Sequence, residues 1–239
     1  MRIPSFSRAV RSTGILTTMF AGVWYVASGQ ASSTPLPANY QTTFENSDVL
    51  VMHVLYGPHE FVPMHDHSAY PTVFVYLTNS GEIDLKHDGS NGFTAQREPT
   101  EAGAFRIAPG MAERHSVTSL SDTDSVFLRV ELKQVPPATV KSVFREETPL
   151  HLVPGTRIEY QDQGLRIERI LCTPDKECTV SPENERSLLV AIGATRIGTA
   201  DGERDLKAGD VIWLPAKGAA LPRLTAGAHF LRVSLLYGN

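Results

Sequence analysis

The two halves of this chain carry the same short sequence signals in the same order. Four pairs correspond: Leu55-Tyr56-Gly57-Pro58 with Leu171-Cys172-Thr173-Pro174, Asp88-Gly89 with Asp201-Gly202, Gly103 and Pro109 with Gly209 and Pro215, and Phe127-Leu128-Arg129-Val130 with Phe230-Leu231-Arg232-Val233. An ordered internal repeat of this kind indicates that one structural unit occurs twice. With 239 residues, the chain is long enough for two such units.

Both halves consist of short β-rich runs separated by turn signals, such as Val49–Tyr56 in the first half and Phe230–Leu236 in the second. No long stretch after residue 30 keeps the 3.6-residue apolar period of a helix. The pattern favours an all-β sandwich or barrel. We therefore predict two homologous β-domains, at about residues 40–135 and 150–239, joined through the proline-bearing stretch Gln134–Thr139.

The first 31 residues have the pattern of a cleaved signal peptide. Arg2, Arg8 and Arg11 precede an apolar stretch at 14–27, and small residues follow it, so cleavage is expected after Gly29 or Ala31. The alternative is an uncleaved membrane anchor, but the apolar stretch is short for a membrane span. We expect an exported protein, periplasmic or secreted, with no stable membrane span after cleavage.

Export bears on the two cysteines. Cys172 and Cys178 are the only pair in the chain. In an oxidising compartment this close spacing favours a disulfide that closes a short loop, and the alternative is two buried thiols.

The motif His65-Asp66-His67 is the clearest candidate for a metal site. Side chains two residues apart on an extended strand point to the same face, so both imidazoles could bind one ion. His115, which follows the turn at Pro109-Gly110, is the candidate for a third ligand. The alternative is a pair of surface histidines on a loop. Neutral imidazole binds Fe, Zn, Cu and Ni. His59, His87, His151 and His229 lack a partner at ligand spacing, and His53 is expected to be a core histidine, with lining of the site as the alternative.

These residues resemble the two sequence motifs of the cupins. Gly57, His65-x-His67 and Gly81 are similar to the first motif, and Gly103, Pro109-Gly110 and His115 are similar to the second. The resemblance covers roughly residues 40–239. Together with the repeat, it implies a bicupin, in which two jelly-roll barrels lie in one chain. It also implies that a homodimer could form, because cupins often pair through sheet edges.

The chain departs from the cupin pattern in both halves. The glutamate ligand that cupins usually carry after the second histidine is absent from Ser68–Thr72, which leaves three histidines as the ligand set. In the second half, the positions equivalent to His65, His67 and His115 are Ser181, Glu183 and Leu221. We therefore expect a degenerate, metal-free second domain. The Cys172–Cys178 disulfide would brace the loop just before these lost positions.

Two residues near the motifs are weak candidates for binding or catalysis. Tyr70 follows His67 by three residues and could reach the mouth of the barrel, although such a tyrosine more often serves packing. Arg106 should share a strand face with Ala104, so it either points into the barrel and binds a carboxylate or points outward as a solvated charge. Glu113 and Arg114 are expected to form a solvated turn.

Three functions fit this sequence. The first is a three-histidine oxygenase-like enzyme acting on a small organic molecule; the resemblance favours Fe(II), with Zn, Ni, Cu or Mn as alternatives. The second is a non-catalytic cupin that binds a metal or a small molecule. The third is a metal-assisted lyase or isomerase, which the lack of an obvious acid–base residue disfavours. A formal charge of −4 without a Lys/Arg-rich run argues against nucleic-acid binding.

Overall fold

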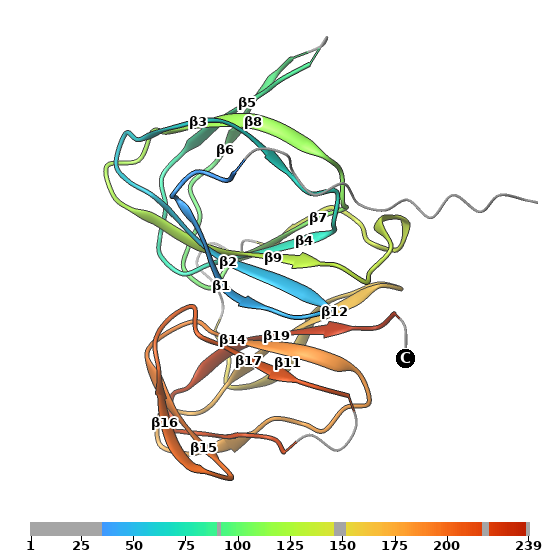
Figure 1. Cartoon of the computed structure of the whole chain (residues 1–239). Coiled ribbons are helices and arrows are strands. Elements are labelled where there is room, and N and C mark those ends of the chain that lie inside the picture. Colours follow the sequence, from blue (N-terminus) through green and yellow to red (C-terminus); the bar gives the residue numbers. More distant parts are fainter. Residues whose placement is uncertain (1–34, 90–91, 146–151, 217–219, 238–239) are drawn as a thin grey trace, which may run out of the picture.

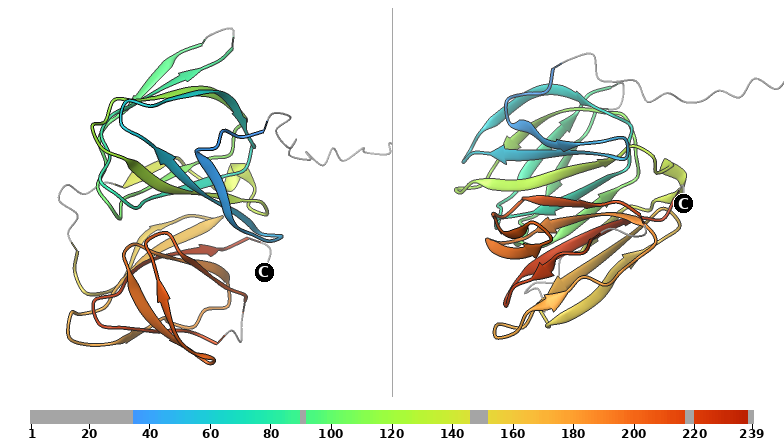
Figure 2. Two further views of the ribbon diagram at one scale, coloured as in Figure 1. Left: turned by 60° about the vertical axis from the view of Figure 1, so that its left-hand side comes forward. Right: turned by 60° about the horizontal axis from the view of Figure 1, so that its bottom comes forward.

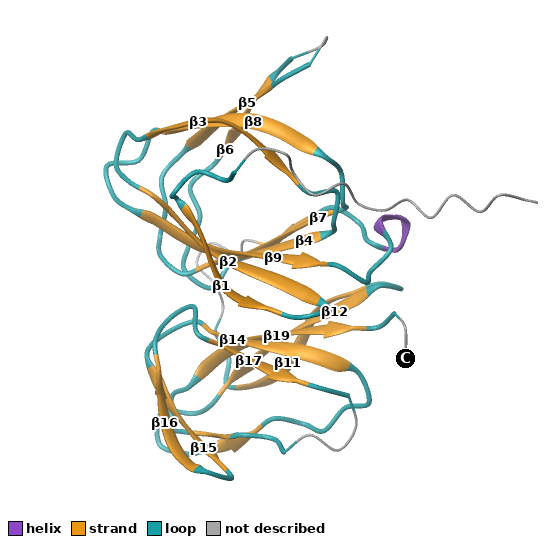
Figure 3. Ribbon diagram, viewed as in Figure 1, coloured by secondary structure: helices purple, strands orange, loops and turns teal. Residues whose placement is uncertain are grey.

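The computed structural model describes residues 35–89, 92–145, 152–216 and 220–237, so the predicted signal peptide lies outside the described residues. Within them the protein is all-β apart from one short 3-10 helix, η1 (Pro137–Thr139) (Figure 3). The strands form four antiparallel sheets, stacked as successive layers, none of which closes on itself (Figure 1). The prediction of two jelly-roll domains is confirmed, with each domain built as a pair of facing sheets.

The first domain has one sheet of six strands and one of four. In spatial order the larger sheet contains β1 (Tyr40–Glu45), β2 (Val49–Tyr56), β9 (Ser125–Leu132), β4 (Thr72–Tyr76), β7 (Phe105–Ala108) and β10 (Val143–Arg145). The smaller sheet contains β3 (Phe61–His67), β8 (Glu113–Ser119), β5 (Ile83–His87) and β6 (Thr94–Arg97). Because β10 follows Gln134–Thr139 and still pairs with β7, the chain leaves this domain later than the sequence suggested.

The second domain repeats the arrangement. Its larger sheet contains β11 (Gly155–Gln161), β12 (Leu165–Leu171), β19 (His229–Leu235), β14 (Arg186–Ala191) and β17 (Val211–Leu214). Its smaller sheet contains β13 (Cys178–Thr179), β18 (Arg223–Leu224), β15 (Thr195–Thr199) and β16 (Gly202–Leu206). In the first domain, β7 follows Gly103 and pairs with β4. In the second domain, β17 follows Gly209 and likewise pairs with β14, the strand equivalent to β4.

The larger sheets of the two domains pack face to face and share one apolar core. This core forms because side chains alternate between the two faces of each strand. On β2, Val49 and Val51 enter the shared core, whereas Met52 and Val54 enter the interior of the first domain. Leu188 and Val190 of β14 enter the shared core from the other side. The contact between the two sheets is seen from two further directions in Figure 2. The two domains therefore form one packed unit.

The internal repeat extends to backbone conformation. Gly103 and Gly209 have φ of 89° and 87°, a region that glycine adopts without steric cost. The N–H of Gly103 donates to the carbonyl of Tyr76, and that of Gly209 donates to the carbonyl of Ala191, at 2.8 Å in both cases. Each glycine also faces the other domain: a Cβ on Gly103 would meet Arg169, and one on Gly209 would meet His53.

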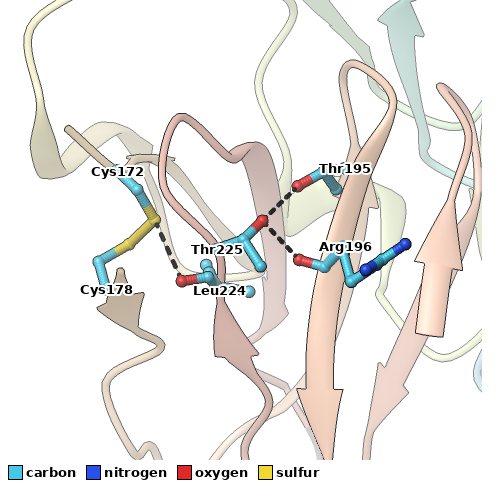
Figure 4. The surroundings of a disulfide bond; sticks show 6 residues. All are labelled: Cys172, Cys178, Thr195, Arg196, Leu224 and Thr225. Atoms are coloured by element: carbon cyan, nitrogen blue, oxygen red, sulfur yellow. Dashed lines mark hydrogen bonds between the residues drawn. A yellow bond between two sulfur atoms is a disulfide. The ribbon is translucent and has the colours of Figure 1, made fainter. Parts of the chain in front are cut away.

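The predicted disulfide is present between Cys172 and Cys178. It joins the end of β12 to the start of β13, which pairs with β18. The Sγ atom of Cys172 lies 4.0 Å from the carbonyl oxygen of Leu224, beside the hydrogen bond from the Thr225 hydroxyl to the carbonyl of Arg196 (Figure 4). The disulfide therefore fixes the edge of the second domain's smaller sheet at which β13 pairs with β18.

Candidate metal centre

The structure brings together the three histidines predicted from the motifs. His65 lies on β3 directly opposite His115 on β8, and His67 lies two residues further along β3. A register shift between Val62 and His65 sets this pairing. Their ring centroids are 4.7 to 5.1 Å apart, and one nitrogen from each ring lies within 4.8 Å of the others. All three side chains are buried.

Burial keeps these imidazoles neutral and leaves lone pairs available. Burial is the main cause that lowers the pKa of each ring; for His65 and His67, Arg129 is the principal nearby charge that adds to the effect. The pKa of His115 is lowered to about 3, again chiefly by burial. Both ring nitrogens of His67 and Nδ1 of His115 are buried without a hydrogen-bond partner. Buried nitrogens of this kind are the donor set that a divalent metal ion would satisfy.

His65 is oriented by two hydrogen bonds. Its Nδ1 donates to the carbonyl of Pro63 at 2.7 Å, so in the neutral ring Nε2 carries the lone pair. The hydroxyl of Tyr40 lies 3.0 Å from Nε2, and the hydroxyl of Tyr56 lies 2.5 Å from that of Tyr40. Burial raises the pKa of Tyr40 above its usual value of 10, so its hydroxyl stays protonated. Sequence reasoning missed both tyrosines.

One carboxylate lies beside the cluster, which corrects the expectation of a solvated turn. Glu113 is the first residue of β8, paired with His67 across the sheet, and it is only partly exposed. One of its oxygens lies 3.9 Å from Nδ1 of His115. Arg114 does point outward, to Asp66 and Asp88. The neighbourhood of the histidines thus contains an acid–base residue after all.

The sheet also places His87 next to the cluster. His87 of β5 lies opposite His115, with ring centroids 5.4 Å apart, and it stacks on Phe93. The sequence could not show this neighbour, because it depends on the register between β5 and β8.

Two guanidinium groups lie in the interior of this domain, over the ring of Phe74. Arg129 pairs with Glu131 at 3.0 Å and lies over one side of the Phe74 ring. Arg97 also lies over this ring and has a buried Nε without a partner. Within the described part of the chain, no carboxylate lies within ion-pair distance of Arg97.

Little free space remains around the histidines. One void of about 10 Å³ is lined by His67, His115 and Arg97, among others, which is room for about one water-sized ligand. A second void of about 30 Å³ is lined by Tyr70 and Glu113 among others. Phe74 and Arg129 line both voids. A groove of about 630 Å³ beside Trp213, at the boundary with the second domain, shares none of these residues.

The two weaker candidates lie near the cluster without touching it. Tyr70 is half-buried on a loop that passes so close to Gly110 that a Cβ there would lie 2.1 Å from the carbonyl of Ala69. Arg106 is half-buried and pairs with Phe74 across the sheet, on the face toward the domain interior. Burial, with the charge of Arg97, lowers the pKa of Arg106. The inward alternative for Arg106 therefore fits better than a solvated charge.

The equivalent positions of the second domain have other contacts. The carbonyl of Ser181 accepts a hydrogen bond from Arg232, and Glu183 pairs with Arg232 at 3.2 Å. Leu221 packs against the apolar interior. Arg232 corresponds to Arg129 in the repeat, so a buried arginine is kept where the histidines are replaced. In the described ranges, His65, His67 and His115 are the one group with metal-ligand geometry.

Comparisons with known proteins give a fold and no closer relationship. No family model matches the chain, and no curated protein matches it. Among solved structures, the protein Ylba from E. coli has a TM-score of 0.59 at 11% identity, covering 86% of this chain and 87% of its own. The bacterial pirin YhhW from Escherichia coli, solved with nickel(II), has a TM-score of 0.56 at 14% identity, covering 82% and 90%.

A third similar structure is salicylate 1,2-dioxygenase from Pseudoaminobacter salicylatoxidans, solved with gentisate. Its TM-score is 0.52 at 13% identity, and the match covers 79% of this chain and 68% of that one. At these identities the likeness shows a shared fold and carries no residue roles. Separately, none of the helices in the described ranges has the length and hydropathy needed to cross a membrane.

Proposed function

Because the chain has the fold of a two-domain cupin with three clustered histidines in its first domain, we propose that it is a metal-dependent, dioxygenase-like enzyme. One Fe(II) ion would be held by His65, His67 and His115, and the substrate would be a small organic molecule. The observation that carries this proposal is the cluster of three buried, neutral imidazoles, in which both ring nitrogens of His67 and Nδ1 of His115 lack a hydrogen-bond partner.

The donor set fits a divalent transition metal and suits iron among others. Three neutral imidazoles leave coordination positions open for other ligands, and imidazole accepts Fe, Zn, Cu, Ni or Mn. The likeness to a nickel-bound pirin and to a dioxygenase supports a divalent metal without choosing between these ions. A bound ferrous ion would supply the site with the capacity to bind and reduce dioxygen.

Residues around the proposed metal site would orient the metal ligands and polarise a bound substrate. The carbonyl of Pro63 fixes the His65 ring with Nε2 free of a proton. Glu113, 3.9 Å from His115, can accept or return a proton. Arg97, whose buried Nε lacks a hydrogen-bond partner among the described residues, favours a ligand that carries negative charge on oxygen. Tyr70 and Arg106 are proposed as outer residues of the same site.

A non-catalytic metal-binding cupin is the second candidate. The void of about 10 Å³ beside His67 and His115 favours it, because a substrate would need side chains such as Phe74 to move. Oxygen consumption separates the two candidates, since a binding protein would hold the metal and consume no oxygen.

The first experiment measures metal content. The parent protein is compared with a His65→Ala/His67→Ala variant and with His59→Ala, in which an exposed histidine outside the cluster is lost. We expect about one iron per chain in the parent and the His59→Ala control, and almost none in the double variant. The iron-loaded protein is then screened for oxygen consumption with small organic acids and phenols.

The outcomes separate the alternatives. Zinc, nickel or copper in place of iron would keep the metal site and count against the Fe(II) oxygenase. No metal in the parent after reconstitution would contradict the metal site itself.

We also propose that the protein is exported. The arginines followed by an apolar stretch at 14–27 support it, as does a disulfide, which persists in oxidising compartments. Mass spectrometry of the protein from the periplasm or medium should find a mature chain that begins at Gln30 or Ser32. An intact amino terminus in the membrane fraction would instead indicate the anchor.

A further inference from the structure

The hydrogen bonds between Tyr56, Tyr40 and His65 have only one direction. Because Nδ1 of His65 donates to Pro63, Nε2 of the neutral ring can only accept. The Tyr40 hydroxyl, at 3.0 Å, therefore donates to Nε2. That uses its single proton, so the Tyr56 hydroxyl donates to Tyr40 at 2.5 Å. Two buried hydroxyls thus form a donor chain that ends on a predicted metal ligand.

Tyr40 and a metal ion compete for the same lone pair. The free nitrogen of His65 is Nε2, since Nδ1 is held by Pro63. A metal ion bound to Nε2 leaves the Tyr40 proton without its acceptor. A buried donor without a partner is unfavourable, so the hydroxyl must find another acceptor nearby.

The place of Tyr40 indicates what this acceptor is. Its ring centroid lies 5.0 Å from that of His65 and 5.1 Å from that of His67, and it is 9% exposed. Tyr40 also lines the void of about 10 Å³ together with His67 and His115. A non-protein ligand of a metal held by these histidines would share this space with the hydroxyl.

We propose that Tyr40 is a positioning residue that donates its hydrogen bond to the non-protein ligand of the metal centre, and that the same hydroxyl is redirected from His65 Nε2 when the metal binds. Tyr56 supports it by donating to the Tyr40 oxygen. The proposal rests on the proposed metal site and concerns binding of the second ligand. It places Tyr40 in the site, although the sequence motifs do not include it.

The test uses cobalt(II) as the metal and azide as the second ligand, both followed by visible absorption of the full chain. Tyr40→Phe keeps the ring and removes the hydroxyl. Without the competing hydrogen bond, cobalt should bind about fivefold more tightly, and without the donor, azide should bind about fivefold more weakly. Tyr56→Phe should change both affinities in the same directions by smaller factors. Tyr237→Phe, at an exposed tyrosine, should change neither.

The opposite changes in cobalt affinity and azide affinity distinguish this role from a packing role. If Tyr40→Phe leaves both affinities unchanged, or lowers both together, the positioning role is wrong while the metal site stands. If the parent binds no cobalt, the proposed metal site fails first. If Tyr40→Phe does not fold, the azide affinity of Tyr56→Phe decides, and an unchanged value overturns the proposal.

Discussion

At the scale of single residues, Arg169 of the second domain links His229 of its own domain to the first domain. Arg169 donates to Nε2 of His229 at 2.7 Å and also to the carbonyl of Gly103 in the first domain. Burial, followed by the charge of Arg169, lowers the pKa of His229 to about 4. The ring is therefore neutral in the folded protein at pH 5, whereas an unfolded histidine with a pKa of about 6.5 is mostly protonated.

This difference predicts a loss of stability in mild acid. The contribution of His229 is complete above pH 6.5 and is lost as the pH falls toward 4, because the unfolded chain binds the proton first. Between pH 7 and pH 5 the loss is about 2 kcal/mol for this group. Urea unfolding of the parent and of His229→Asn at both pH values measures it. The clustered histidines contribute equally to both proteins, so equal pH dependence in the two would contradict the assignment.

At the scale of strands, the sequence motifs located the ligands but not their surroundings. His65 and His67 could be placed on one face because side chains alternate along a strand. Tyr40 could not be assigned to His65, because the contact depends on how β1 and β3 face each other across the domain. Glu113 and His87 were missed for a related reason, since cross-strand register is not visible in a single sequence. Arg97 reaches the site from β6, the edge strand of the smaller sheet.

The disulfide that joins the end of β12 to the start of β13 leads to a prediction about thermal stability. Closing a loop of this size by a disulfide stabilises a fold by about 2 kcal/mol. A Cys172→Ala/Cys178→Ala variant should therefore melt about 4–8 °C below the parent. Adding reductant should lower the parent's melting temperature and leave that of the variant unchanged. No difference between parent and variant would show that the bond does not brace the second domain.

At the scale of the whole molecule, the second domain covers the outer apolar face of the first domain's larger sheet. Val73 and Val75 of β4 are fully buried against a cluster that includes Leu188 and Leu231. The homodimer implied by the cupin resemblance would have to use other surfaces, such as the sheet edges, and stays a prediction. The second domain thus has a structural role that does not depend on ligand residues.

Separation of the domains should expose this apolar face. A fragment of residues 32–145 expressed alone should aggregate or bind hydrophobic dyes, because an uncovered apolar sheet face is an association site. Co-expression with a fragment of residues 152–239 should restore a soluble one-to-one complex, as judged by light scattering. A soluble monomer of the first fragment alone would show that the shared core is dispensable.

The shared core also changes the molecularity of folding. Two separate domains that met through such a face would associate more completely as their concentration rose. In this chain the two faces belong to one molecule, so their contact is a unimolecular event governed by an effective concentration. Dilution would therefore leave the larger sheet of the first domain covered, whatever the concentration of the protein.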